Sequence, residues 1–205
     1  MLIHHPSNFA LVNVPRTGGG ALGAAMQAAL GIETGFDSAA PDLRHLFASD
    51  ARRLLGRRRW PQLHSVAVVR NPYDRVVGLY HDHRRRGAIA AAGFDAFVRQ
   101  DLGGLSAADV HFHPQARFVE EDGQVLVKRL YAFEDGIQAI FEDLCARFDL
   151  APAQVPHPLQ SVRRAWEEYY ARRDTLERVS AIYARDFELL GYRRLADPPG
   201  LGAPA

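Results

Sequence analysis

The chain has 205 residues, with 25 basic side chains, 24 acidic side chains and a single cysteine, Cys145. One cysteine excludes an intramolecular disulfide and any multi-cysteine metal site. The start of the sequence lacks the basic and apolar stretches of a secretory signal, and no apolar run approaches membrane-spanning length, so we expect a cytoplasmic protein. Length and composition predict one domain over residues 1–195 and a flexible tail at residues 196–205.

The first predicted unit consists of a strand, a glycine loop and a helix. Residues 9–14 form a short apolar run that ends at Pro15, which is typical of a buried strand. The glycines at 18–20 follow, and the segment 21–30 is rich in Ala, Leu and Met, which favour a helix.

A second unit of the same kind begins at residues 66–69, a β-branched run that predicts another buried strand. Pro72 suits the first turn of a helix that runs to about Arg86. A third strand is predicted at residues 125–130, after a turn signal. Apolar residues at helical spacing then predict a helix over residues 137–148, in which Cys145 is buried.

Two more helices are predicted at about residues 162–172 and 175–190, the second closed by Gly191. The aromatic cluster Trp166, Tyr169 and Tyr170 is expected to pack inside this part of the chain. Strands that alternate with helices indicate an α/β fold, with a mainly parallel sheet flanked by helices and a helical C-terminal annex.

Residues 13–20 (NVPRTGGG) carry the first chemical signal. A glycine loop between a buried strand and a helix exposes backbone N–H groups beside the positive end of the helix dipole, an arrangement that binds phosphate or sulfate. Arg16 adds a positive charge and Thr17 a hydroxyl. The Gly-Lys-Ser/Thr sequence of nucleotide triphosphatases is absent. Close packing of the strand on the helix is the alternative explanation of the glycines.

The second signal lies at residues 69–80 (VRNPYDRVVGLY). The two loops together resemble those of the PAPS-dependent sulfotransferases, especially the carbohydrate-type branch. The donor PAPS is 3′-phosphoadenosine 5′-phosphosulfate, and PAP is its product. Residues 111–115 (HFHPQ), 130–135 (LYAFED) and 183–192 are similar to later segments of that family, so the likeness spans about residues 9–192.

The resemblance implies a P-loop-like parallel sheet and a donor site. It assigns the 5′-phosphosulfate to Arg16, Thr17, Gly18, Gly19, Gly20 and Ala21. It assigns the 3′-phosphate to Arg70. Gly78 stands at a position of that site where the family usually has serine, and the missing hydroxyl costs about 1.5–3 kcal/mol of donor binding. Arg75, one helical turn beyond Arg70, is expected to form a structural ion pair or to lie at the edge of the site.

Sulfuryl transfer requires in-line geometry and stabilisation of the negative charge on the departing phosphate. Arg16 is predicted to supply this charge purely electrostatically, because a guanidinium does not give up a proton. Another side chain must accept the proton of the attacking hydroxyl. The candidates are Asp37, His45, His111 and His113. The last two are favoured by their place in a matched segment, where an extended chain would turn both to one face.

We therefore expect a PAPS-dependent O-sulfotransferase that acts on a carbohydrate or another small hydroxyl compound. No metal is implied, because arginine and backbone dipoles supply the charge at the donor site. A two-histidine metal site at His111 and His113 is an alternative that no third ligand at useful spacing supports. No nucleic-acid partner is expected, because the basic stretch at residues 44–86 lacks interleaved aromatic residues. The alternatives are a non-catalytic sulfotransferase-like nucleotide-binding protein and, less favoured, a P-loop kinase.

Overall fold

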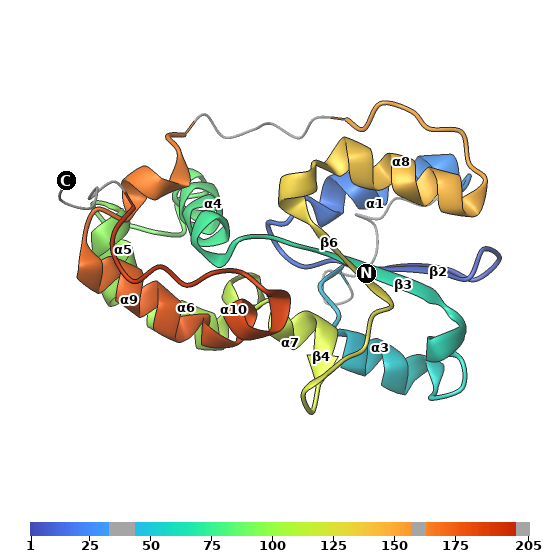
Figure 1. Ribbon diagram of the computed structural model, residues 1–205, viewed down its shortest axis with the longest axis horizontal. Helices are drawn as coiled ribbons and strands as arrows, with labels where there is room; N and C mark the ends of the chain where they lie inside the picture. Colours follow the sequence, from blue (N-terminus) through green and yellow to red (C-terminus); the bar gives the residue numbers. More distant parts are fainter. Residues whose placement is uncertain (33–43, 157–162, 200–205) are drawn as a thin grey trace. The chain divides into compact units, whose positions relative to one another are not determined.

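The computed structural model describes residues 1–32, 44–156 and 163–199 (Figure 1). The chain divides into two compact units. The sheet unit comprises Met1–Arg70 and Arg117–Leu159, and the helical unit comprises Asn71–Ala116 and Gln160–Ala205. The predicted single domain over residues 1–195 stays a prediction, and residues 200–205 of the predicted tail lie outside the described residues.

The sheet unit is built on a four-stranded sheet in the order β1-β2-β3-β6. Its strands are β1 (Leu2–His4), β2 (Phe9–Val12), β3 (His64–Val69) and β6 (Arg129–Ala132). Strands β2, β3 and β6 run parallel, and only β1 is antiparallel to its neighbour. The mainly parallel sheet is thus confirmed, and the carboxyl ends of its three parallel strands lie at one edge.

Helices α1 (Gly19–Ala29) and α8 (Ile137–Phe148) pack side by side on one face of this sheet, and Figure 1 shows α3 (Ala48–Leu55) on the other side. Side chains alternate along a strand, so one set from each strand meets the two helices. The strand residues in this core are Leu2, Phe9, Leu11, Val66, Val68 and Tyr131. Cys145 of α8 is buried among them, as predicted.

Short elements complete the sheet unit. They are η1 (Trp60–Gln62), α7 (Ala116–Val119, which begins in the helical unit), β4 (Glu120–Glu121), β5 (Gln124–Val125) and η3 (Phe133–Asp135). The predicted strand at 125–130 is wrong in its bounds. The turn before it closes the small β4–β5 hairpin, and the strand of the main sheet begins only at Arg129, which pairs with Val66.

The helical unit contains the remaining elements. They are α4 (Pro72–Arg85), α5 (Phe94–Gln100), α6 (Leu102–Ala108), η2 (Val110–Phe112), η4 (Trp166–Tyr169), α9 (Arg173–Ile182) and α10 (Ala184–Leu190). Its core is aromatic, and the largest side chains there are Tyr73, Tyr80, Phe94, Phe97, Phe112, Tyr170, Tyr183 and Phe187. Helix α4 begins at Pro72 as predicted, and the Asn71 side chain caps it by accepting from the Tyr73 N–H at 3.0 Å.

Two helix predictions in this unit are corrected. Among the described residues of the predicted segment 162–172, only η4 is helical. Its aromatic residues are drawn into the core instead: Trp166 stacks on Tyr73 with ring centroids 5.6 Å apart, so the expected aromatic packing is confirmed. The predicted helix 175–190 is two helices, broken at Tyr183, whose hydroxyl donates to the Phe112 carbonyl at 2.9 Å.

In the part of the chain that the structure describes, every helix is too short or too polar to cross a membrane.

Candidate functional site

The loop between β2 and α1 is tightly turned. Arg16 and Gly18 both adopt left-handed backbone conformations, with φ of 65° and 85°. Thr17 is fully buried and its hydroxyl donates to the Val14 carbonyl at 3.0 Å. The Thr17 hydroxyl therefore stabilises the turn of the loop through this hydrogen bond. Left-handed residues in a tight turn produce the concave arrangement of N–H groups that binds anions.

The three glycines of this loop differ in what they make possible. A Cβ on Gly18 would overlap the side chain of Ile137 in α8, and a Cβ on Gly19 would lie 2.6 Å from Asn13 Oδ1. Close packing thus explains these two glycines. Gly20 is exposed, and no atom of the described residues lies within 4 Å of where its Cβ would stand. Packing does not account for Gly20, which leaves the backbone open to a bound group at this point.

The first turn of α1 carries no acidic side chain of its own. The N-cap of this helix is Gly18, which offers no side-chain acceptor. The first N–H groups of a helix have no partner within the helix, and they carry the positive end of its dipole. In an eleven-residue helix that begins directly after the loop, these groups suit a phosphate or sulfate.

Arg70 follows β3 and lies against the same loop. One of its guanidinium nitrogens donates to the Arg16 carbonyl at 3.1 Å, and its Cζ lies 4.0 Å from the centre of the Phe133 ring. Only 8% of the residue is exposed. The structure thus brings together the two arginines on which the predicted donor site depends. It also shows that Arg70 supports the loop, a role that the sequence analysis did not predict. The signal was available, because adjacent parallel strands end at the same edge of a sheet and so place Arg70 beside the loop.

His45 has a similar bracing position in the sheet unit. Its Nδ1 lies 2.9 Å from the Asn13 carbonyl, at the entry to the loop. Two other predicted site positions are not among the described residues of the sheet unit. Gly78 lies in the buried part of α4 in the helical unit, and Asp37 lies outside the described residues.

The two favoured histidines lie in the helical unit, but not as predicted. Residues 110–112 form the 3₁₀ turn η2, so the extended chain that would have aligned the two rings is absent. The Nδ1 of His111 lies 2.9 Å from Asp109 Oδ1, whereas the Nδ1 of His113 lies 2.9 Å from the Ser106 carbonyl. The His111 side chain is 38% exposed, and His113 is buried.

A buried polar network fixes this histidine segment. Arg75 is completely buried, and one guanidinium nitrogen donates to the carbonyls of His111 and His113 at 2.9 and 3.0 Å. Burial lowers the pKa of Arg75, and the nearby Tyr183 and Asp186 oppose this shift. The hydrogen bonds of Arg75 run to two carbonyls of the histidine segment, and the predicted structural ion pair stays a prediction. A buried guanidinium that holds two carbonyls positions the backbone that carries the histidines.

The carboxylate of Asp186 completes the network. It accepts from the backbone N–H groups of Gln115 and Ala116 at 2.9 and 2.8 Å. The three sequence segments around Arg75, His111 and Asp186 are thus parts of one buried network. Their separation along the chain hid this connection from sequence reasoning.

A parallel α/β sheet carries, at the carboxyl edge of its strands, a glycine loop and helix start suited to a phosphate or sulfate group. The profile of the Sulfotransferase family matches residues 2–193, so the chain belongs to this family. Searches of curated proteins and of solved structures returned no match.

Proposed function

We propose that the protein transfers a sulfuryl group from PAPS to a hydroxyl group of a carbohydrate or another small acceptor, and releases PAP. The observation that carries this proposal is the glycine loop between β2 and α1 with Arg70 lying against it, in a chain of the Sulfotransferase family. The cytoplasmic location belongs to the same proposal.

In this proposal the 5′-phosphosulfate is bound by the loop and the start of α1, residues 16–21. Backbone N–H groups and the helix dipole supply positive potential without a metal ion. Arg16 neutralises the charge that develops on the departing phosphate, and Arg70 binds the 3′-phosphate. Both roles suit a guanidinium, which presents several donors in one plane to phosphate oxygens.

The attacking hydroxyl must lose its proton, and His111, His113 and Asp37 are the proposed acceptors. Of the two described residues, His111 has the more exposed ring. Loss of a general base lowers kcat about 10²–10⁴-fold. His111→Gln and His113→Gln, compared for kcat and for PAP affinity, assign the role. The base variant loses turnover and keeps PAP binding.

The experiment that tests the proposal is PAP release from PAPS over a panel of sugars and other hydroxyl compounds. We expect acceptor-dependent PAP release by the wild type. Arg16→Ala lowers kcat about 10²–10³-fold because it removes charge stabilisation in the transition state, and Arg16→Lys keeps part of the activity. PAP binding without transfer to any acceptor would instead favour a non-catalytic nucleotide-binding relative.

A further inference from the structure

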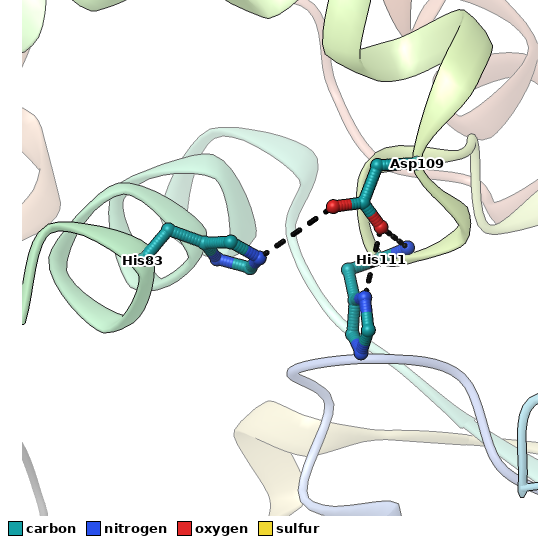
Figure 2. Close-up of side chains that lie close together, drawn as sticks. All are labelled: His83, Asp109 and His111. Carbon is teal, nitrogen blue, oxygen red and sulfur yellow. Dashed lines mark hydrogen bonds and ion pairs between the residues drawn. The ribbon is translucent and has the colours of Figure 1, made fainter. Parts of the chain in front are cut away.

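Three side chains in the helical unit gather in a cluster outside the donor loop. One of them, His111, is also a proposed proton acceptor, and an ion bound to its ring would leave that role to His113 or Asp37. His83 comes from the last turn of α4, Asp109 from the residue between α6 and η2, and His111 from η2 itself (Figure 2). Each offers one ligand atom, and these atoms all lie within 4.8 Å of one another. His83 lies 26 or more positions before the other two residues in the sequence, so local spacing could not have identified it as the third ligand.

The distances within the cluster match a metal centre. Asp109 Oδ1 lies 2.9 Å from His111 Nδ1, and Asp109 Oδ2 lies 3.8 Å from His83 Nε2. In a tetrahedral zinc site with bonds of about 2.0–2.1 Å, neighbouring ligand atoms lie roughly 3.3 Å apart. The two observed distances lie on either side of that value. The carboxylate therefore lies between the two imidazole rings. Small shifts of these side chains bring their ligand atoms to coordination distance of one ion.

The His83 ring is oriented as in a metal ligand. Its Nδ1 lies 3.0 Å from the Leu79 carbonyl, so Nδ1 must carry the proton of that hydrogen bond. In the neutral ring the lone pair is then on Nε2, the atom that faces Asp109 (Figure 2). A histidine whose second nitrogen donates to a carbonyl is the usual arrangement of a metal ligand. A lone pair and a carboxylate oxygen that face each other favour a cation between them.

The surroundings hold the ligands and leave one side open. The His83 ring packs against Phe112 with centroids 4.5 Å apart, and only 10% of its side chain is exposed. The His111 carbonyl is held by Arg75. The side chains of Asp109 and His111 are 33% and 38% exposed. The cluster thus has a rigid inner wall and an outer side that solvent reaches.

The geometry points to a binding site for one divalent transition-metal ion, held by His83, Asp109 and His111, with its remaining coordination position open to water or to an oxygen ligand. Two imidazoles and one carboxylate suit Zn²⁺, Co²⁺ or Fe²⁺ and lack the thiolates that softer ions prefer. This site does not rest on the proposed sulfuryl transfer. Bound metal would tie the end of α4 to the η2 turn.

Titration of the purified chain with Co²⁺ and Zn²⁺ tests this site. We expect one ion per chain, a visible d–d absorption band with Co²⁺ and a rise in Tm with Zn²⁺, because an ion that binds only the folded state stabilises it. Asp109→Asn and His83→Gln should each weaken binding by at least about tenfold. His111→Gln changes the most exposed ring and serves if the buried His83 variant does not fold.

His81→Gln is the matched control, because this histidine lies on the same helix and its Nε2 contacts Tyr169 rather than the cluster. It should bind the metal as the wild type does. Stoichiometric binding that all three ligand variants leave unchanged would overturn the proposal, as would the absence of any Co²⁺ band or Zn²⁺-induced rise in Tm. The readout is metal binding alone, so it is independent of whether PAPS is the donor.

Discussion

Single residues decide whether the loop between β2 and α1 can form, and Gly18 is the clearest case. Its φ of 85° lies in the left-handed region, and a Cβ there would overlap Ile137. Gly20, two residues later, has open space around it. The two positions belong to one loop, yet the structure gives them opposite tolerance to a methyl group.

We expect Gly18→Ala to lower the free energy of unfolding by about 2–4 kcal/mol, because left-handed backbone strain and side-chain overlap add together. Gly20→Ala is the matched control and should stay within roughly 0.5 kcal/mol of the wild type or gain stability, because Ala favours a helix. Urea unfolding of both variants measures the difference. Equal losses would contradict the assigned loop conformation.

The Asp143 carboxyl on α8 gives a second prediction for a single residue. Hydrogen bonds from Arg147 and Tyr131 lower the pKa of this carboxyl to about 2. A depressed carboxyl pKa contributes stability above its unfolded value near 3.8, and this contribution is lost as the pH falls toward 2. Because the side chain is 37% exposed, solvent screening limits the contribution to at most about 1 kcal/mol.

Asp143→Asn should therefore be slightly less stable than the wild type at pH 7, and the difference should shrink as the pH falls from 5 toward 2. Thermal unfolding of both proteins across this range is the measurement. A gap that widens on acidification would show that the sign of the pKa shift is wrong.

Within the helical unit, Asp186 joins α10 to the backbone of Gln115 and Ala116. Asp186→Asn removes a carboxylate that accepts two backbone N–H groups and leaves the buried Arg75 without that nearby negative charge. We expect a loss of about 3–5 kcal/mol in the free energy of unfolding. Glu188→Gln changes an exposed carboxylate on the same helix and should cost less than about 1 kcal/mol. Similar losses in both variants, measured by urea unfolding, would contradict the network.

The elements also show which parts of the fold the sequence can predict. Helix α8 has its predicted bounds, because its apolar residues recur at helical spacing and pack together against one sheet. The strand near residue 128 was misplaced because an apolar run beside a turn contains no information about its partner strand. The helix predicted around Trp166 failed because aromatic packing on Tyr73 outweighs local propensity.

The candidate sites divide in the same way. The glycine loop and Arg70 were predicted because each motif is continuous in sequence and follows a recognisable strand. The cluster of His83, Asp109 and His111 was missed because only the packing of α4 near η2 joins its members. The alignment of His111 with His113 was wrong because a 3₁₀ turn replaced the extended chain.

At the scale of the whole molecule, each unit is built from two separate stretches of chain. Folding the sheet unit alone would require closing the loop formed by residues 71–116, an entropic cost on the order of 3 kcal/mol. The same argument applies to the helical unit, whose two stretches are separated by residues 117–159. We therefore expect the two units to unfold together.

The two tryptophans report this directly, because Trp60 lies in the sheet unit and Trp166 in the helical unit. Fluorescence-monitored urea unfolding of Trp60→Phe and Trp166→Phe follows each unit through the remaining tryptophan. For each variant, the urea midpoint measured by tryptophan fluorescence should coincide with the urea midpoint measured by circular dichroism at 222 nm. The comparison is made within one variant, so the stability lost by the substitution affects both midpoints equally. Two separated transitions would show that the units are independent.

The proposed function requires the loop after β2 and Arg70 to bind a 3′-phosphorylated nucleotide. Calorimetric titration with PAP, adenosine 5′-monophosphate and ATP tests it most directly, on the wild type, on Arg70→Ala and on Arg58→Ala as an exposed control in the same unit. We predict a Kd for PAP on the order of micromolar, roughly tenfold to hundredfold tighter than for the monophosphate, with the preference lost only in Arg70→Ala. Equal affinity for PAP and adenosine 5′-monophosphate would contradict the account.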